Sequence, residues 1–454
     1  MHAEWKETMI VCESSPQELE AYPKAKEKYL AVGNLYGRSV AWTLTRTEIM
    51  HKTLQPTGGG PMISKKCVFT VILIAGLIFS TLSNITPTFA QQKSEPIKIG
   101  ALLPLTGALL KEGPLDKEGL EMAFEDAGWE VAGRKIELII EDDATDPTTA
   151  LDKARKLVER DKVVAIIGPH HSGVANAIQP YINQNKIVNL KVMQFPKALK
   201  AKYPYMIALD GTQDQNCAPM GWFAYEKLGY KKVTTIGPDY VAGRAFLGGF
   251  MSGFKEKGGT IVQEQWFPVG SIDFGPYLGN LKDADAFCGW VEGPGALRLI
   301  TQYYDYGVNK KMPLIGAYAS NLLSEETLPQ LGDKGLGIYG PTAWASTFDH
   351  PISKKVVAKF KAKHGVRPND TLMIGGYMNA FVLLHALKVT GGNTDPEKLR
   401  AAILGLNLKD TPMGPLRFTP EGSGVLNIHI IKTAKVGDEY LWEIVQTYPE
   451  IEPR

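Results

Sequence analysis

Short apolar runs alternate with amphipathic stretches from Pro96 onward, and this alternation limits the possible folds more than any other feature of the sequence. The runs at 97–103, 136–140 and 163–167 have the length and the β-branched content of buried strands, and a segment with helical spacing follows each of them. A second series of the same kind begins near Gly211. Strands that alternate with helices pair in parallel. The sequence therefore predicts an α/β fold with two parallel-sheet units in tandem.

The length of the chain agrees with two domains, and its charge argues against nucleic acid as a partner. A chain of 454 residues is longer than the roughly 250–300 residues over which a single core keeps growing. The 50 basic and 48 acidic residues give a net charge of +2, and no basic stripe is interleaved with aromatic residues, so we expect no nucleic-acid partner. The four cysteines have no CxxC spacing, which argues against a zinc knuckle or a redox pair.

Residues 62–90 show the three regions of a secretory signal peptide in order. Lys65 and Lys66 supply positive charge, 67–79 is a short apolar run, and Thr88-Phe89-Ala90 places small residues at the positions that signal peptidase reads. A membrane-spanning helix needs a longer run, of about 20 residues. We interpret 1–61 as a non-native upstream extension, and we expect an exported, periplasmic mature chain.

Three segments resemble chemical motifs, and each has a simpler interpretation. The glycines of 335–340 match GxGxxG, but Pro341 follows and no helical pattern begins there, so we expect no cofactor. The histidines in 170–172 have no acid at a diagnostic spacing, and we expect no metal. The acidic run 141–143 is interpreted as a solvated loop. Because no set of nucleophile, base and orienting residue is visible, an enzyme is not expected.

Several candidate residues lie just after predicted strands. Ligands of open parallel sheets bind outside the carboxyl ends of the strands, where helix N-termini present free N–H groups. The segments that follow strands in this way are 106–107, 168–172, 239–244, 289–293 and 316–318. All of them could converge on one cleft.

The order of these segments resembles the branched-chain amino acid-binding family of periplasmic solute receptors, with the leucine-binding type I fold. The resemblance runs from about Pro96 to about Ile444. Its motifs are Ile97-Lys98-Ile99-Gly100 with Pro104-Leu105-Thr106-Gly107, the DDxxDP segment 142–147, Ala165-Ile166-Ile167-Gly168-Pro169 with Ser172-Gly173, Asp273-Phe274, and Pro313-Leu314-Ile315-Gly316.

This resemblance implies a type I periplasmic binding protein with two Rossmann-like parallel-sheet lobes joined by a three-segment hinge. Lobe one would comprise 97–210 and 344–410, and lobe two 212–340 and 413–454. The implied function is a monomeric receptor that binds a small carboxylate between the lobes and delivers it to the permease subunits of an ABC importer. A sensory or regulatory module of the same fold is the alternative.

Site residues carried over to lobe one surround a ligand carboxylate. By the resemblance, Ser172 holds the carboxylate through its hydroxyl and N–H, and His171 beside it is a candidate for the pocket wall. Met193 and Gln194 stand where family members usually have Ala-Thr. With Tyr318, and with Ala242 where family members often have Tyr, they depart from the amino-acid pattern.

In lobe two the resemblance points to aromatic residues. Trp290 falls on a pocket aromatic, Tyr240 is expected nearby, and Tyr318 stands where amino-acid binders often place the acid that receives the ammonium. A phenol offers no charge, which favours an aromatic or other amine-free carboxylate over leucine-like amino acids. Glu292 leaves the amino-acid alternative open, because it could turn inward and receive an ammonium.

The cysteines of the mature chain are expected to be unbonded. The disulfide of some relatives would need cysteines near Thr145 and His171, where this chain has none. We predict two free, mostly buried thiols, with Cys217 near the start of a helix and Cys288 near the end of a strand.

Overall fold

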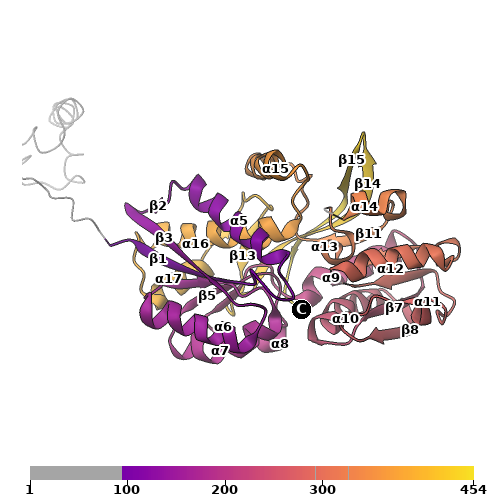
Figure 1. Cartoon of the computed structure of the whole chain (residues 1–454), viewed down its shortest axis with the longest axis horizontal. Helices are drawn as coiled ribbons and strands as arrows, with labels where there is room; N and C mark the ends of the chain where they lie inside the picture. Colours follow the sequence, from indigo (N-terminus) through magenta and orange to yellow (C-terminus); the bar gives the residue numbers. More distant parts are fainter. Residues whose placement is uncertain (1–94, 292, 326) are drawn as a thin grey trace, which may run out of the picture. The chain divides into compact units, whose positions relative to one another are not determined.

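The computed structural model describes residues 95–454 apart from residues 292 and 326 (Figure 1). The predicted signal peptide at 62–90, the predicted extension at 1–61 and the candidate Glu292 therefore lie outside the described residues. The described part is α/β and contains two sheets.

The first sheet has six strands in the order β2-β3-β1-β4-β5-β6, and all pairs are parallel except β2 with β3. Its strands are β1 (Ile97–Leu103), β2 (Glu130–Val131), β3 (Arg134–Asp142), β4 (Ala165–Ile167), β5 (Val188–Lys191) and β6 (Met206–Ala208). The helices between them are α5 (Glu112–Asp126), α6 (Pro147–Arg155) with the π-helical turn η2 (Lys156–Arg160), α7 (Ser172–Gln184) and α8 (Lys197–Lys200).

Strand β1 shows why this sheet is covered on both faces. Ile99, Ala101 and Leu103 belong to the large core cluster, whereas Leu102 belongs to a separate cluster with residues of α6 and α7. Successive side chains of a strand point to opposite faces, so a strand buried on both faces is apolar throughout. The run at 97–103, apolar apart from Lys98, is this signal.

The second sheet has nine strands in the order β12-β13-β14-β11-β10-β9-β7-β8, with β15 paired to β14. Its strands are β7 (Lys232–Pro238), β8 (Thr260–Phe267), β9 (Ala286–Gly289), β10 (Leu314–Gly316), β11 (Tyr339–Thr342), β12 (Asn407–Leu408), β13 (Leu416–Phe418), β14 (Gly424–Val436) and β15 (Glu439–Ile451). Its helices are α9 (Gln213–Glu226), α10 (Val241–Glu256), α11 (Gly275–Leu278), α12 (Pro294–Asp305), α13 (Ala319–Leu323) and α14 (Leu328–Leu331), with the 3-10 turns η3 (Val308–Lys310) and η4 (Gly332–Gly335).

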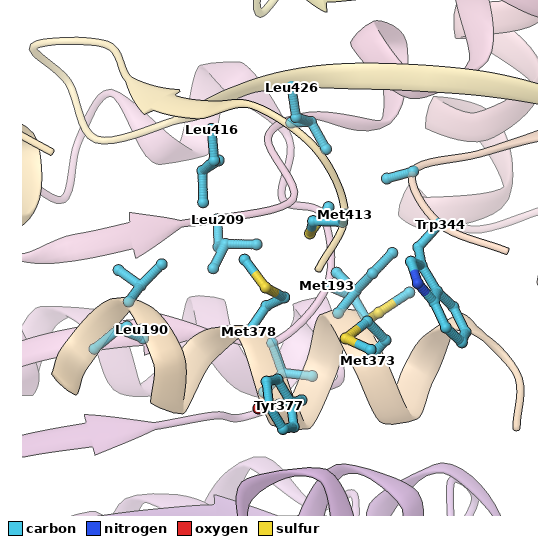
Figure 2. Close-up of a cluster of buried hydrophobic side chains, with 14 of the residues drawn as sticks. Leu190, Met193, Leu209, Trp344, Met373, Tyr377, Met378, Met413, Leu416 and Leu426 are labelled. Atoms are coloured by element: carbon cyan, nitrogen blue, oxygen red, sulfur yellow. The ribbon is translucent and has the colours of Figure 1, made fainter. Parts of the chain in front are cut away.

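Three later helices follow β11: α15 (Pro351–His364), the π-helical η5 (Thr371–Tyr377) continuing into α16 (Met378–Val389), and α17 (Pro396–Leu404). The stretch Thr371–Val389 is long and apolar enough to cross a membrane by length and composition, but it is mostly buried inside the protein. Figure 2 shows Met373, Tyr377 and Met378 of this stretch gathered with side chains from the first sheet and from the segment around β13 and β14. It is packed as a core helix.

The predicted alternation of strands and helices is confirmed, with ends that differ by a few residues. The interpretation of 141–143 as a solvated loop is wrong. Asp143 is fully buried, and burial raises its pKa to about 6. Asp142 accepts hydrogen bonds from the N–H groups of Leu105 and Thr106, at 3.0 and 3.1 Å, and so orders the loop after β1. These acids are part of the scaffold.

Candidate ligand-binding site

The N-terminus of α7 is positioned by the loop after β4. Gly168 has φ +108°, and a Cβ there would lie 2.0 Å from the carbonyl oxygen of Leu102, so only glycine fits. His171 is the N-cap, and its Nδ1 accepts a hydrogen bond from the N–H of Val174 at 3.3 Å. Ser172 is therefore the first helical residue.

Two backbone N–H groups at this helix end remain for a ligand. Val174 and Ala175 donate to the ring and the carbonyl of His171, which leaves the N–H groups of Ser172 and Gly173. Burial lowers the pKa of His171, and the nearby Lys191 and His170 lower it further, which favours the neutral ring whose Nδ1 accepts the capping bond. The helix end is ready to bind an anion.

Lys191 at the end of β5 joins this loop to the next one. Its side chain is 1% exposed, and its Nζ donates to the carbonyl oxygens of His170 at 2.6 Å, Val192 at 2.5 Å and Gln194 at 3.1 Å. Burial lowers the pKa of Lys191 to about 7, opposed by the charges of Asp116 and Asp210. The loops after β4 and β5 are thus fixed to each other.

The two candidates in the loop after β5 differ in what their side chains do. Met193 has φ +60°, and its side chain lies in the core near Met373 and Trp344 (Figure 2). Gln194 is 2% exposed, and its Nε2 has no hydrogen-bond partner among the described residues. Only Gln194 of the pair has a polar side chain, and this side chain lies beside Asp210 and Tyr318.

Three lobe-two candidates belong to one aromatic cluster, which we define as Tyr240, Phe246, Trp290 and Tyr318. Phe246 stacks on Trp290 with ring centroids 4.7 Å apart and lies 5.2 Å from the ring of Tyr318. The ring centroids of Tyr240 and Trp290 are 6.0 Å apart. Trp290 and Tyr318 are fully buried, and Tyr240 is partly exposed. Sequence reasoning missed Phe246, which occupies a ring face of Trp290.

Two buried acids from other segments of the chain, Asp210 and Asp370, lie beside Tyr318. We define the hinge cluster as Gln194, Asp210, Tyr318, Thr342 and Asp370. Thr342 Oγ1 donates to Asp370 Oδ2 at 2.9 Å. Burial raises the pKa of Asp210 well above its usual range, and the nearby Asp370 raises it further. Burial also raises the pKa of Asp370 to about 6.

The hinge cluster has polar atoms without partners. Both carboxyl oxygens of Asp210, Oδ1 of Asp370 and the hydroxyl of Tyr318 are buried and complete no hydrogen bond of good geometry among the described residues. Leaving one such group unpaired costs about 1–3 kcal/mol. The side chains of Gln194 and Asn216 lie against Asp210, and those of Ser320 and Tyr318 lie against Asp370.

A pocket of about 390 Å³ lies near these residues but contains none of the predicted ones. Its lining comes from α8, α9, α10 and the end of the chain, and includes Lys197, Gln213 and Arg454. The pocket therefore adjoins the predicted site along the chain, next to Gln194 and Asp210, without coinciding with it.

Comparisons with known proteins agree with this architecture. The profile of the periplasmic binding protein family matches residues 96–435. A Leu/Ile/Val-binding protein homolog of Brucella melitensis is 27% identical over 364 residues, which cover 78% of this chain and 92% of the relative.

Solved structures are also similar. An ABC transporter substrate-binding protein from Sphaerobacter thermophilus has a TM-score of 0.75 and 32% identity, covering 79% of this chain and 99% of the other. A solute-binding protein from Rhodopseudomonas palustris BisB5, in complex with 3,4-dihydroxybenzoic acid, has a TM-score of 0.72 and 30% identity, covering 79% and 98%. The leucine-binding protein of Thermotoga maritima, at 24% identity and a TM-score of 0.67, shares the fold.

The family comprises binding receptors of ABC transporters and not enzymes, which agrees with the expectation from the sequence. The two lobes, the parallel-dominated sheets and the matched length fit the type I architecture. The chain therefore belongs to the periplasmic binding protein family, as a solute-binding protein of an ABC transporter.

Proposed function

We propose that this receptor binds an aromatic carboxylate between its lobes, with the carboxylate at the N-terminus of α7 and the ring beside the aromatic cluster. The observation that carries the proposal is that Tyr318 belongs to both clusters. Its ring lies against Phe246 of the aromatic cluster, and its hydroxyl lies next to Gln194 of the hinge cluster. The solved relative bound to 3,4-dihydroxybenzoic acid supports the same ligand class.

A branched-chain amino acid is the rival ligand, and the Leu/Ile/Val-binding relatives favour it. Asp370, which is ionised above about pH 6, could pair with an ammonium. Calorimetric titration with benzoate, 4-hydroxybenzoate, leucine and valine separates the two. We expect micromolar binding of an aromatic acid and none of leucine. Leucine binding without binding of any aromatic acid would overturn the proposal.

The role of Ser172 is tested by Ser172→Ala. A hydrogen bond to a charged group contributes about 1.5–3 kcal/mol, so loss of the hydroxyl should weaken aromatic-acid binding roughly ten- to a hundredfold. Thr148→Ala, in the first turn of α6 and exposed, is the matched control and should bind normally. Unchanged affinity in Ser172→Ala, measured by calorimetry, would remove this residue from the site.

The receptor is proposed to act in the periplasm as a monomer, after removal of a signal peptide at 62–90, and to dock on permease subunits. The order of charge, apolar run and small residues supports this. Intact mass of the exported protein should give Gln91 as the first residue, and gel filtration should give one copy per particle. Peptides from 1–61 on the exported protein would contradict the assignment. The sensory alternative has no observation in its favour.

A further inference from the structure

We infer that His170 is a further ligand-binding residue, whose Nε2–H donates to the ligand carboxylate beside the N-terminus of α7 and makes capture of this anion depend on pH. This inference rests on the proposed function. It adds a charged donor to a carboxylate site whose other donors, in Ser172 and Gly173, are neutral. Its basis is the way in which one buried acid holds the His170 ring.

His170 lies in the loop that leads into α7. It stands two residues before Ser172, and its carbonyl oxygen accepts a hydrogen bond from the buried Lys191 ammonium at 2.6 Å. This bond fixes the backbone of His170 before a ligand arrives. The direction of the ring then depends on the contacts of the ring itself.

The ring is held by Asp116 of α5. Nδ1 of His170 lies 2.8 Å from Oδ2 of Asp116, and Asp116 is fully buried. A Cβ on Gly375 of η5 would lie 2.0 Å from Oδ1 of Asp116, so the carboxylate is confined between the ring and the backbone of η5. The His170 side chain is 14% exposed, and its Nε2 makes no hydrogen bond among the described residues and is not closed off from solvent. Nε2 is therefore the ring nitrogen that is left for a ligand.

The surrounding charges favour the protonated ring. Burial lowers the pKa of His170, but the charge of Asp116 and the hydrogen bond to it outweigh burial, so that the pKa is raised above its usual value. The titratable groups that face the ring are Asp116 and Glu112 of α5, Asp143 after β3, Lys191 at the end of β5, and His171. The acids of α5 outweigh the opposing charge of Lys191, and the imidazolium is stabilised.

The protonation state decides what Nε2 offers to a carboxylate. In the imidazolium both ring nitrogens are donors. Because the Asp116 carboxylate keeps a hydrogen on Nδ1, deprotonation removes the hydrogen of Nε2 and leaves a lone pair there, which repels a carboxylate oxygen. The protonated ring therefore binds the anion and the neutral ring does not. Affinity for an anionic ligand should be full below the pKa of His170 and should fall as the pH rises through it.

Benzoate and benzamide test this inference, because they have nearly the same shape and only benzoate is an anion. Both are titrated calorimetrically into the wild-type protein between about pH 5.5 and 9, where the benzoate carboxylate stays ionised. We expect benzoate affinity to fall by about tenfold or more across this range, while benzamide affinity stays constant. At the acidic end, benzoate should bind roughly ten- to a hundredfold more tightly than benzamide.

Variants then assign the pH dependence to the ring and its acid. His170→Gln keeps a neutral donor but no titrating charge, so benzoate affinity at about pH 6 should fall roughly tenfold and lose its pH dependence, while benzamide binds as before. Asp116→Asn keeps an acceptor for Nδ1 but removes the negative charge, so the fall in benzoate affinity should move to lower pH. His364→Gln is the matched control and should keep the wild-type profile, because His364 also bonds an acid of α5, Glu118, at 2.9 Å, but is exposed.

The possible outcomes separate this inference from the proposed function. Benzoate binding that is independent of pH in wild type, or equal to that of benzamide at the acidic end, overturns the inference while leaving aromatic-acid binding intact. So does a pH dependence that survives in His170→Gln, which would assign the titrating charge to Lys191. If His170→Gln does not fold, the Asp116→Asn profile decides, and an unshifted profile overturns the inference. Absence of binding for every aromatic acid overturns the proposed function itself.

Discussion

Replacing Lys191 by Met tests whether one buried ammonium fixes the binding loops. Methionine has a similar unbranched stem, so the substitution mainly removes the three donated hydrogen bonds. The carbonyls of His170, Val192 and Gln194 would then be buried without these donors. His170 lies in the same loop as Ser172, so the substitution should lower both the stability of the protein and its affinity for the ligand.

The magnitude follows from two opposing contributions. Hydrogen bonds from a charged donor contribute about 1.5–3 kcal/mol each. Against this, methionine avoids the cost of burying a charge, the same cost that lowers the pKa of Lys191 to about 7. Removing one member of a buried charged network typically costs about 3–5 kcal/mol, and we expect a loss in this range. At roughly 2 °C per kcal/mol for a large domain, Tm should fall by about 6–10 °C.

Thermal unfolding followed by circular dichroism, together with urea titration, measures this loss. Lys202→Met is the control, because Lys202 is exposed and the same substitution there should shift Tm by no more than about 1 °C. A Lys191→Met variant as stable as wild type would refute the reasoning. It would show that the burial cost of the ammonium equals what its three bonds contribute.

Further predictions concern two other buried features. Burial raises the pKa of Glu325 to about 8, so the folded state binds more protons than the unfolded state between about pH 4.5 and 8. Wild type should therefore lose stability as pH rises through this window, by on the order of a few kcal/mol, and Glu325→Gln should not; parallel pH profiles of the two proteins would contradict this. Cys217 and Cys288 are both free and buried, as expected from the sequence, so thiol titration of the denatured, unreduced mature protein should count two, and a count of zero would indicate a disulfide.

The fold was largely predictable because its signals are local. Apolar runs and helical spacing repeat within each βαβ unit, and they locate strands and helices without tertiary information. Element ends depend on side-chain geometry instead. Helix α9 begins at Gln213 because Thr212 and Gln215 form a reciprocal capping box, which a periodic pattern alone does not reveal.

The site was predictable only in part, for the same reason. Ser172 and Trp290 follow strands and could be placed from the pattern. Asp210 and Asp370 are far apart in the sequence, lie outside periodic segments, and come together with Tyr318 only in the folded chain. Phe246 lies in a segment with the pattern of an ordinary apolar helix. No sequence signal identified it as the residue that stacks on Trp290.

The contact between α5 and η5 has a consequence for the order of folding. A Cβ on Gly119 would lie 2.1 Å from the carbonyl oxygen of Leu372, so these two helices touch backbone to backbone. Helix α5 is among the first elements to leave the ribosome, yet the surface that covers it comes more than half a chain later. A vectorially released chain must keep the apolar side of α5 exposed until then, and long-range closure of this kind slows folding. The core around α5 is thus completed by a segment that lies more than half a chain further on.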